Sequence, residues 1–173
     1  GGGALLGFGV RGFEPLLRGA DLDGAVVLCE FPESPEKNAL SWQFVKEGLS
    51  GGEKALIILA QVPVDEMKRG LTSLGLSFDE EVEKGRIAFL NWSEISKTDK
   101  VGGTLRLPSL VAMKFAELGV GTKKRVLLVG LHHLLSSIPQ AQASQFVSDL
   151  VGQIRAGVSL GCIIIDASSV PVN

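Results

Sequence analysis

The sequence has few cysteines, little net charge and no long apolar run, and each absence limits what the protein can be. Its two cysteines, Cys29 and Cys162, lie in apolar, strand-like runs, which favours buried reduced thiols of a cytoplasmic protein over a disulfide. Seventeen basic and nineteen acidic residues give a net charge of −2, so no general attraction to nucleic acid or anionic lipid is expected. No apolar run reaches the ~20 residues that cross a bilayer, and the start lacks the pattern of a signal peptide. We therefore expect a soluble, cytoplasmic protein without a membrane partner.

The composition is that of an ordinary globular domain. Of the 173 residues, 45% are hydrophobic and 21% are charged, and this length is typical of a single domain with a real core. We expect one domain over residues 1–173, with a flexible end over residues 1–8. Residues 96–106 place Gly102 and Gly103 among polar and charged side chains, which indicates a mobile loop.

Short apolar runs alternate with longer amphipathic segments along the chain. Ser34, Pro35 and Gly48 mark the expected start and end of the first helix. The expected strands are "GAVVLCEF", "EKALIILAQ", "GRIAFLNW", residues 126–129 and "GCIIIDAS". The expected helices are "SPEKNALSWQFVKEGLS", "VDEMKRGLTSLG", "LPSLVAMKFAELG" (starting at Pro108) and "QAQASQFVSDLVGQIRAG". Strands that are apolar on both faces and alternate with helices predict an α/β fold of three layers, with a mainly parallel central sheet between helices.

Ligands of such sheets bind beyond the carboxyl ends of the strands, and the first loop there is residues 30–36. Lys37 follows this loop at the start of a helix, as the lysine of a phosphate-binding loop does. The loop "EFPESPE" contains no glycine, however, and its prolines and carboxylates remove N–H donors and repel anionic oxygens. Asn38 stands where a hydroxyl would bind magnesium. Two interpretations stay open, a phosphate ligand or a solvated lysine, and the residues favour the second.

The order and spacing of these segments resemble the RecA-like P-loop ATPases of the KaiC group over most of the chain. The opening "GVRGFEPLLRGADLDG" matches the glycines and the Leu-Leu pair of that group. "VVLCEFPESPEKNALSWQF" then aligns without a gap on its strand, phosphate loop and helix, and "EGLSGGEKALII" continues the match into the second strand. The resemblance implies a RecA/KaiC-like P-loop NTPase fold.

The departures from that family concern its catalytic parts. The resemblance places the glycine-rich Walker A loop on residues 31–36 and its magnesium-binding hydroxyl on Asn38. It places the two water-polarising glutamates on Gln61 and Val62. Gln61 can orient a water but cannot take its proton. The Walker B acid falls on Val129 or Gly130. With both motifs degenerate, we expect no ATP hydrolysis by this mechanism, no ATP or magnesium cofactor and no catalytic or metal residue.

Other polar residues at strand ends are weaker candidates for a site. His132 and His133 follow the fourth strand, but neighbours on an extended segment point to opposite sides and rarely chelate one metal. Asp166 ends the fifth strand and is either a sensor-type residue or the cap of the next turn. Cys29 has no adjacent base.

Two further segments carry groups of charged side chains. The acidic run of residues 79–83 is expected to be a solvated helical face. Lys97, Lys100 and Arg106 give their loop a weak positive bias, which without interleaved aromatics is a poor signal for nucleic acid.

Three functions are compatible with these observations. The first is a catalytically inactive RecA/KaiC-like domain, a pseudo-ATPase, that serves as an assembly or regulatory subunit through a protein partner or self-association. The alternative is a sensor that binds a nucleotide without hydrolysis, with Lys37, Asn38 and Gln61 as its candidate contacts. A DNA-associated RecA-like protein is a second alternative, against which the net charge of −2 argues.

Overall fold

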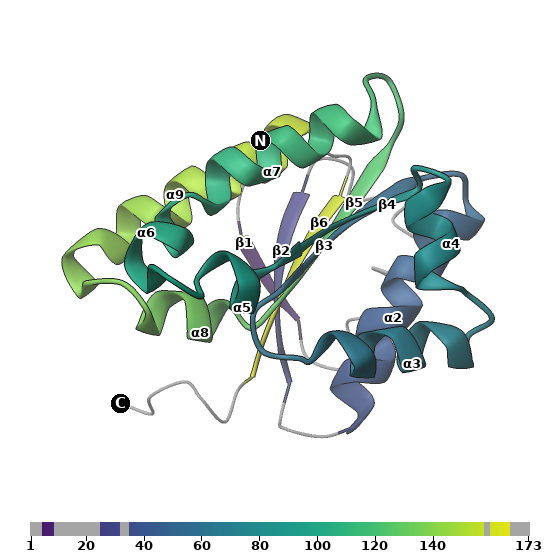
Figure 1. Cartoon of the computed structure of the whole chain (residues 1–173), viewed down its shortest axis with the longest axis horizontal. Helices are drawn as coiled ribbons and strands as arrows, with labels where there is room; N and C mark the ends of the chain where they lie inside the picture. The colour runs from purple at the N-terminus through teal and green to yellow at the C-terminus, as the bar shows by residue number, and fades with distance from the viewer. Residues whose placement is uncertain (1–4, 9–24, 32–34, 158–159, 167–173) are drawn as a thin grey trace.

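The computed structural model describes the backbone of residues 5–8, 25–31, 35–157 and 160–166, and the side chains of residues 39–157. Its centre is a six-stranded sheet in the order β1-β2-β6-β5-β3-β4, and every pairing is parallel (Figure 1). The strands are β1 (Leu5–Phe8), β2 (Ala25–Phe31), β3 (Lys54–Leu59), β4 (Ile87–Asn91), β5 (Lys124–Val129) and β6 (Leu160–Asp166). All strand carboxyl ends therefore lie at one edge of the sheet, which we call the carboxyl edge.

Helices cover both faces of this sheet, so the predicted three-layer α/β/α fold is confirmed. One face carries α2 (Pro35–Ser50), α3 (Val64–Ser73) and α4 (Phe78–Glu83), and the other carries α7 (Leu107–Leu118) and α9 (Gln140–Gly157) (Figure 1). Three short helices complete the second layer: α5 (Trp92–Ile95), α6 (Lys100–Leu105) and α8 (Leu131–Ser136). None of the described helices combines the length and apolar character that crossing a membrane requires.

The alternation of side chains along β3 explains why the core has two halves. Ala55, Ile57 and Leu59 point to the α2 side, where they pack with Phe44 and other buried residues. The two side chains between them, Leu56 and Ile58, join the core under α7 and α9. All five are at most 1% exposed, as expected for a parallel strand that is covered on both faces.

The first strand was missed by the sequence analysis, and the flexible end expected over residues 1–8 is wrong for its second half. Residues 5–8 form β1, which pairs in register from Leu5 opposite Val26 to Phe8 opposite Cys29. Residues 1–4 lie outside the described part. A four-residue strand is too short to show a period of its own, and its extended form is fixed by hydrogen bonding to β2.

Residues 96–106 were expected to be a mobile loop, and over most of this range the structure has the helix α6 instead. Asp99 caps it, with a side-chain oxygen 3.0 Å from the N–H of Gly102. Gly103 is buried, and a Cβ there would lie 2.6 Å from the carbonyl oxygen of Ile95. The glycine marks a close contact between two helices, which a sequence pattern does not distinguish from a loop glycine.

The predicted start of the first helix at Pro35 is confirmed, but its predicted end at Gly48 is wrong, because α2 continues to Ser50. At Gly48 a Cβ would lie 2.8 Å from Cδ of Arg125. This glycine therefore leaves room for a buried arginine, and does not terminate the helix. The third predicted helix, α7, begins at Leu107, one residue before the expected Pro108.

Candidate functional site

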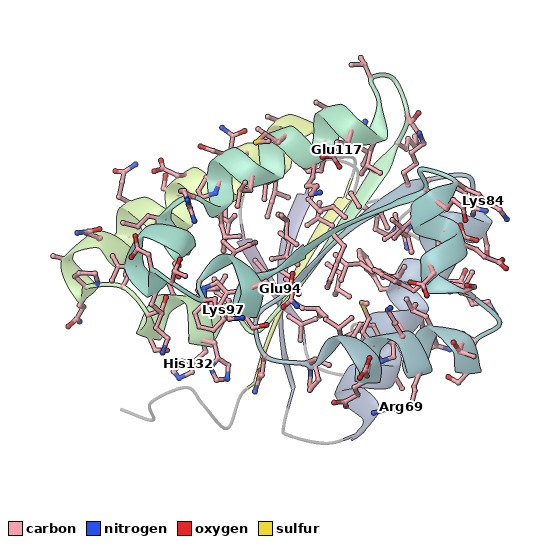
Figure 2. All side chains as sticks on the ribbon, in the orientation of Figure 1. Arg69, Lys84, Glu94, Lys97, Glu117 and His132 are labelled. Carbon is pink, nitrogen blue, oxygen red and sulfur yellow. The ribbon has the colours of Figure 1, made fainter. Side chains whose placement is uncertain are left out.

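The candidate site is the carboxyl edge, where β2 leads toward α2, β3 toward α3, β4 into α5 and β5 into α8. Figure 2 shows His132, on α8, at this end of the molecule, whereas Lys84 and Glu117 lie toward the opposite end. The parallel topology brings segments that are distant in sequence to one place, which is where ligands bind in sheets of this kind.

Lys37 and Asn38 lie in the first turn of α2, directly after the carboxyl end of β2. The first turn of a helix has unpaired N–H groups and about half a positive charge, so its position suits an anion. Pro35 removes one of these donors. The side chains of both residues, and loop residues 32–34, lie outside the described part of the chain. Their assignment as nucleotide contacts remains a prediction.

Gln61 follows β3, and Gly130 follows the neighbouring strand β5. The N–H of Ala60 donates to the carbonyl of Val129 at 2.8 Å, so the strands stay in contact past their last ladder pair. Gly130 has a φ of 99°, and a Cβ at this position would lie 2.7 Å from Cβ and 2.8 Å from the backbone N of Gln61. Of the two positions that the resemblance offers for a magnesium-supporting acid, Gly130 therefore has a left-handed backbone and no room for a side chain. The other, Val129, is fully buried in the apolar cluster under α2 and α3.

Val62 belongs to the packing of the fold. It is half-buried against the apolar cluster under α2 and α3. The next residue, Pro63, precedes α3, and its carbonyl accepts from the N–H of Met67 at 3.2 Å. Neither residue offers a group that takes up or donates a proton, so the chemistry of this loop is limited to the amide of Gln61 and to backbone groups.

Among the side chains of residues 39–157, the carboxylates near this edge do not gather into a metal site. The acidic residues after β3 are Asp65 and Glu66 in the first turn of α3, and Glu94 lies on α5. Within the described ranges, no group of three or more His, Cys, Asp or Glu side chains is placed to hold a metal ion. Asp166 is the last residue of β6, and its backbone pairs in register with Phe31 at the end of β2. That placement at the carboxyl edge agrees with its predicted position after the fifth apolar run.

His132 and His133 are not on an extended segment, so that prediction was wrong. Both lie in α8, which begins after Gly130, and their ring centroids are 6.3 Å apart with the planes at 69°. The N–H of His133 donates to the carbonyl of Gly130 at 3.0 Å. The six residues of α8 follow an apolar strand directly and are too few to show a helical repeat of apolar residues, so the sequence does not distinguish them from a continued strand.

A hydrogen-bond network behind the carboxyl edge connects α5, α6 and the end of α8. The sequence did not predict it. The indole N–H of Trp92 donates to Oγ1 of Thr104 at 2.8 Å, and Thr104 Oγ1 lies 2.7 Å from Oγ of Ser137. Thr104 is fully buried. The three residues come from α5, α6 and the end of α8, so the network fixes the helices that follow β4 and β5 relative to one another. No spacing rule connects residues 92, 104 and 137, and only the fold brings them together.

The acidic run over residues 79–83 was expected to be a solvated helical face, and this is wrong for one member. Glu81 is buried on α4, and its carboxylate lies 3.2 Å from Nε of Arg86. Arg86 also donates to the carbonyl of Leu49 at 2.8 Å, so this pair joins α4 to the end of α2. The cations considered for nucleic acid, Lys97, Lys100 and Arg106, are exposed on and around α6.

Comparisons with known proteins bear on the fold alone. No protein-family model matches the sequence, and no curated protein matches it. Among solved structures, the chain is similar to the crystal structure of a KaiC-like protein from the hyperthermophilic archaeon Pyrococcus horikoshii, with a TM-score of 0.69. The fold is KaiC-like. The match covers 88% of this chain and 67% of the archaeal chain at 15% identity. The predicted RecA/KaiC-like fold is therefore confirmed, and at this identity the similarity carries no residue roles.

Proposed function

We propose that this chain is a RecA/KaiC-like domain over residues 1–173 that does not hydrolyse ATP and serves as an assembly or regulatory subunit through protein–protein contacts. The observation that carries the proposal is the contact between Gly130 and Gln61. It leaves no space for an acidic side chain at Gly130, one of the two positions onto which the resemblance places the magnesium-supporting acid, and the other position holds the buried, apolar Val129.

Two further observations support loss of the reaction. Gln61 has an amide where the resemblance places a carboxylate, and an amide cannot take a proton from the attacking water. Val62 is packed against the core and offers no polar group. The loop "EFPESPE" adds negative charge and two prolines where triphosphate would need N–H donors.

Two exposed apolar side chains on α6 support a role in protein contacts. Val101 and Leu105 are 40% and 38% exposed and lie one turn apart on this helix. Neighbouring apolar side chains on a surface, unlike scattered single ones, indicate a contact with a partner. The partner in this proposal is a second copy or a related domain.

The test measures turnover and association together. Phosphate release from Mg-ATP is expected to stay at the buffer level for the wild type, for Lys37→Ala and for Lys46→Ala, the matched lysine farther along α2. Light scattering over a concentration series is expected to show self-association that Leu105→Glu weakens. ATP turnover that Lys37→Ala abolishes and Lys46→Ala preserves would refute the inactive subunit. A strict monomer unaffected by Leu105→Glu would refute self-association.

Nucleotide binding without hydrolysis is a second candidate, favoured by one observation. Lys37 lies in the first turn of the 16-residue helix α2 at the carboxyl edge, the place where an anion meets helix N–H groups. In this case Asn38 and Gln61 are the neighbouring contacts. Isothermal titration with ATP, with and without magnesium, is expected to show binding that Lys37→Ala removes and Lys46→Ala retains. No heat in the wild type would reject this candidate and leave the assembly role standing.

A further inference from the structure

A hollow lies at the opposite edge of the sheet, far from the nucleotide-type site. A cavity of about 380 Å³ opens between the ends of α7 and α9, under the loop that enters β5. Its wall includes Phe115, Thr122, Lys124 and Gly157. Figure 1 shows the loop between α7 and β5 at the end of the molecule away from α8. The volume is at the small end of the range for sites that bind metabolites.

One lysine, Lys124, lines this cavity, and a second, Lys54, lies next to its wall at Gly119. Lys124 is 6% exposed, and its Nζ donates to the carbonyl of Thr122 at 2.8 Å. Lys54 Nζ donates to the carbonyl of Leu118 at 2.6 Å, and it lies 3.8 Å from the place of a Cβ on Gly119, which also lines the cavity. Each ammonium group has three N–H donors, so one such bond leaves donors for a ligand.

Over residues 39–157, whose side chains the structure describes, no carboxylate is paired with the ammonium group of Lys54 or Lys124 within 4.0 Å. Ion pairs in this range include those of Lys68, Arg86, Lys114 and Arg125. Burial, and then the positive charge of Lys54, lower the pKa of Lys124, because both disfavour the charged form. A nearby anion would favour the charged form of Lys124 and so oppose this lowering of its pKa.

The carboxyl-terminal ends of α7 and α9 bring partial negative charge to the same cavity. This negative charge has to be compared with the positive charge of the two ammonium groups. Each helix end carries about half a negative charge, so the two together offset roughly one of the two ammonium charges. About one positive charge is left at the cavity. The hydrogen bond from Lys54 to the carbonyl of Leu118 therefore caps α7, but the two helix ends do not neutralise both ammonium groups.

We propose that this cavity binds the oxyanion group of a small metabolite, a phosphate or a carboxylate, with Lys124 and Lys54 as hydrogen-bond donors and the Phe115 ring against the apolar part of the ligand. The site is independent of the carboxyl edge, which lies at the other end of the strands. Its use therefore does not depend on whether the nucleotide-type site is active.

The test is a titration of the whole chain followed by ¹H–¹⁵N NMR at constant ionic strength, with inorganic phosphate in one arm and benzoate in the other. Saturable shifts are expected at the amides of Gly119, Gly121 and Thr122. Lys124→Met and Lys54→Met keep the apolar stems and are each expected to weaken binding at least about tenfold. Lys114→Met is the control, because that lysine is paired with Glu117 outside the cavity. The arm that saturates at the lower concentration identifies the ligand class.

Three results would overturn the proposal: no saturable shift with either anion, shifts that do not centre on this loop, or equal binding by wild type and Lys54→Met. Thermal unfolding separates binding from a capping role. Phosphate is expected to raise the Tm of the wild type and leave that of Lys124→Met unchanged. A lower Tm for Lys124→Met, with no effect of phosphate on the wild type, would mean that the lysines only cap. If Lys124→Met does not fold, the wild-type map and Lys54→Met still decide.

Discussion

Gly130 and Gln61 meet almost backbone to backbone: a Cβ added to Gly130 would lie 2.8 Å from the backbone N of Gln61. The contact joins the ends of β5 and β3, the two strands whose exits the RecA resemblance makes catalytic. At Gly130, one of the two positions onto which the resemblance places the family's acid, the fold has no space for a side chain. The consequences of this and three other relationships can be measured.

Placing the acid back at Gly130 is expected to damage the protein and to restore no activity. Gly130→Asp adds a side chain at a φ of 99°, which costs about 1–3 kcal/mol, and pushes it against Gln61, which costs a similar amount. Urea unfolding is therefore expected to show a loss of about 3 kcal/mol. Gly121→Asp is the control, because its φ is 87° and nothing lies within 4 Å of its Cβ. A stable Gly130→Asp protein with magnesium-dependent ATP turnover would contradict the proposed inactive site.

Two helix glycines are expected to respond to alanine with opposite signs. At Gly152, on α9, a Cβ meets nothing within 4 Å, so Gly152→Ala is expected to gain up to about 1 kcal/mol from helix propensity. At Gly48 the new Cβ meets Arg125, which is held by Glu53 at 2.8 Å and the Phe44 carbonyl at 3.0 Å. Gly48→Ala is therefore expected to lose about 1–3 kcal/mol. The check is the unfolding free energy of both variants, and a gain for Gly48→Ala would show that Arg125 moves freely.

The network behind the carboxyl edge is expected to contribute measurably to stability. Thr104→Val keeps the shape of the side chain but removes the oxygen that accepts from Trp92 and contacts Ser137. A polar group left without its partner in a buried place costs about 1–3 kcal/mol. Chemical unfolding is the measurement, and Thr72→Val, at an exposed position on α3, is expected to change little. Equal effects of the two substitutions would mean that the network adds nothing.

Lys124 is expected to make the protein more stable as the solution becomes alkaline. Its pKa in the folded state is lowered from the ordinary value of 10.5. Between the lowered pKa and 10.5 the unfolded chain binds more protons at this lysine than the folded one, so the free energy of unfolding rises with pH there. Below that window the contribution is constant.

The measurement is the difference in unfolding free energy between wild type and Lys124→Met across this range. Other ion pairs weaken as their lysines lose charge at high pH, and this effect is the same in both proteins, so it cancels in the difference. The unfolding free energy of the wild type is expected to rise relative to that of Lys124→Met as the pH rises. A flat difference would mean that the folded protein does not disfavour the charged form of Lys124.

The sequence predicted the fold through the alternation of short apolar runs with amphipathic segments. The apolar runs at β2 to β6 are each apolar on both faces, and only a sheet covered on both sides buries such runs, so the layers and the parallel arrangement followed. The positions of Lys37, Gln61 and Asp166 at strand exits followed from the same reasoning, because each comes directly after, or one short loop beyond, such a run. Their chemical roles did not follow, since a residue type at a strand exit is compatible with several functions.

Short elements and contacts between distant residues were decided by the tertiary structure. β1, α6 and α8 have four to six residues, fewer than a period needs to become visible, and they form because neighbouring elements pair with them or pack on them. Gly48 and Gly130 look like ordinary helix-end or turn glycines in the sequence, and only the structure shows the side chain or backbone that each admits. The sequence alone determines which runs must be buried, because the apolar composition of each run is local to it. Only the tertiary structure decides which residues contact one another, because the close contacts join residues tens of positions apart.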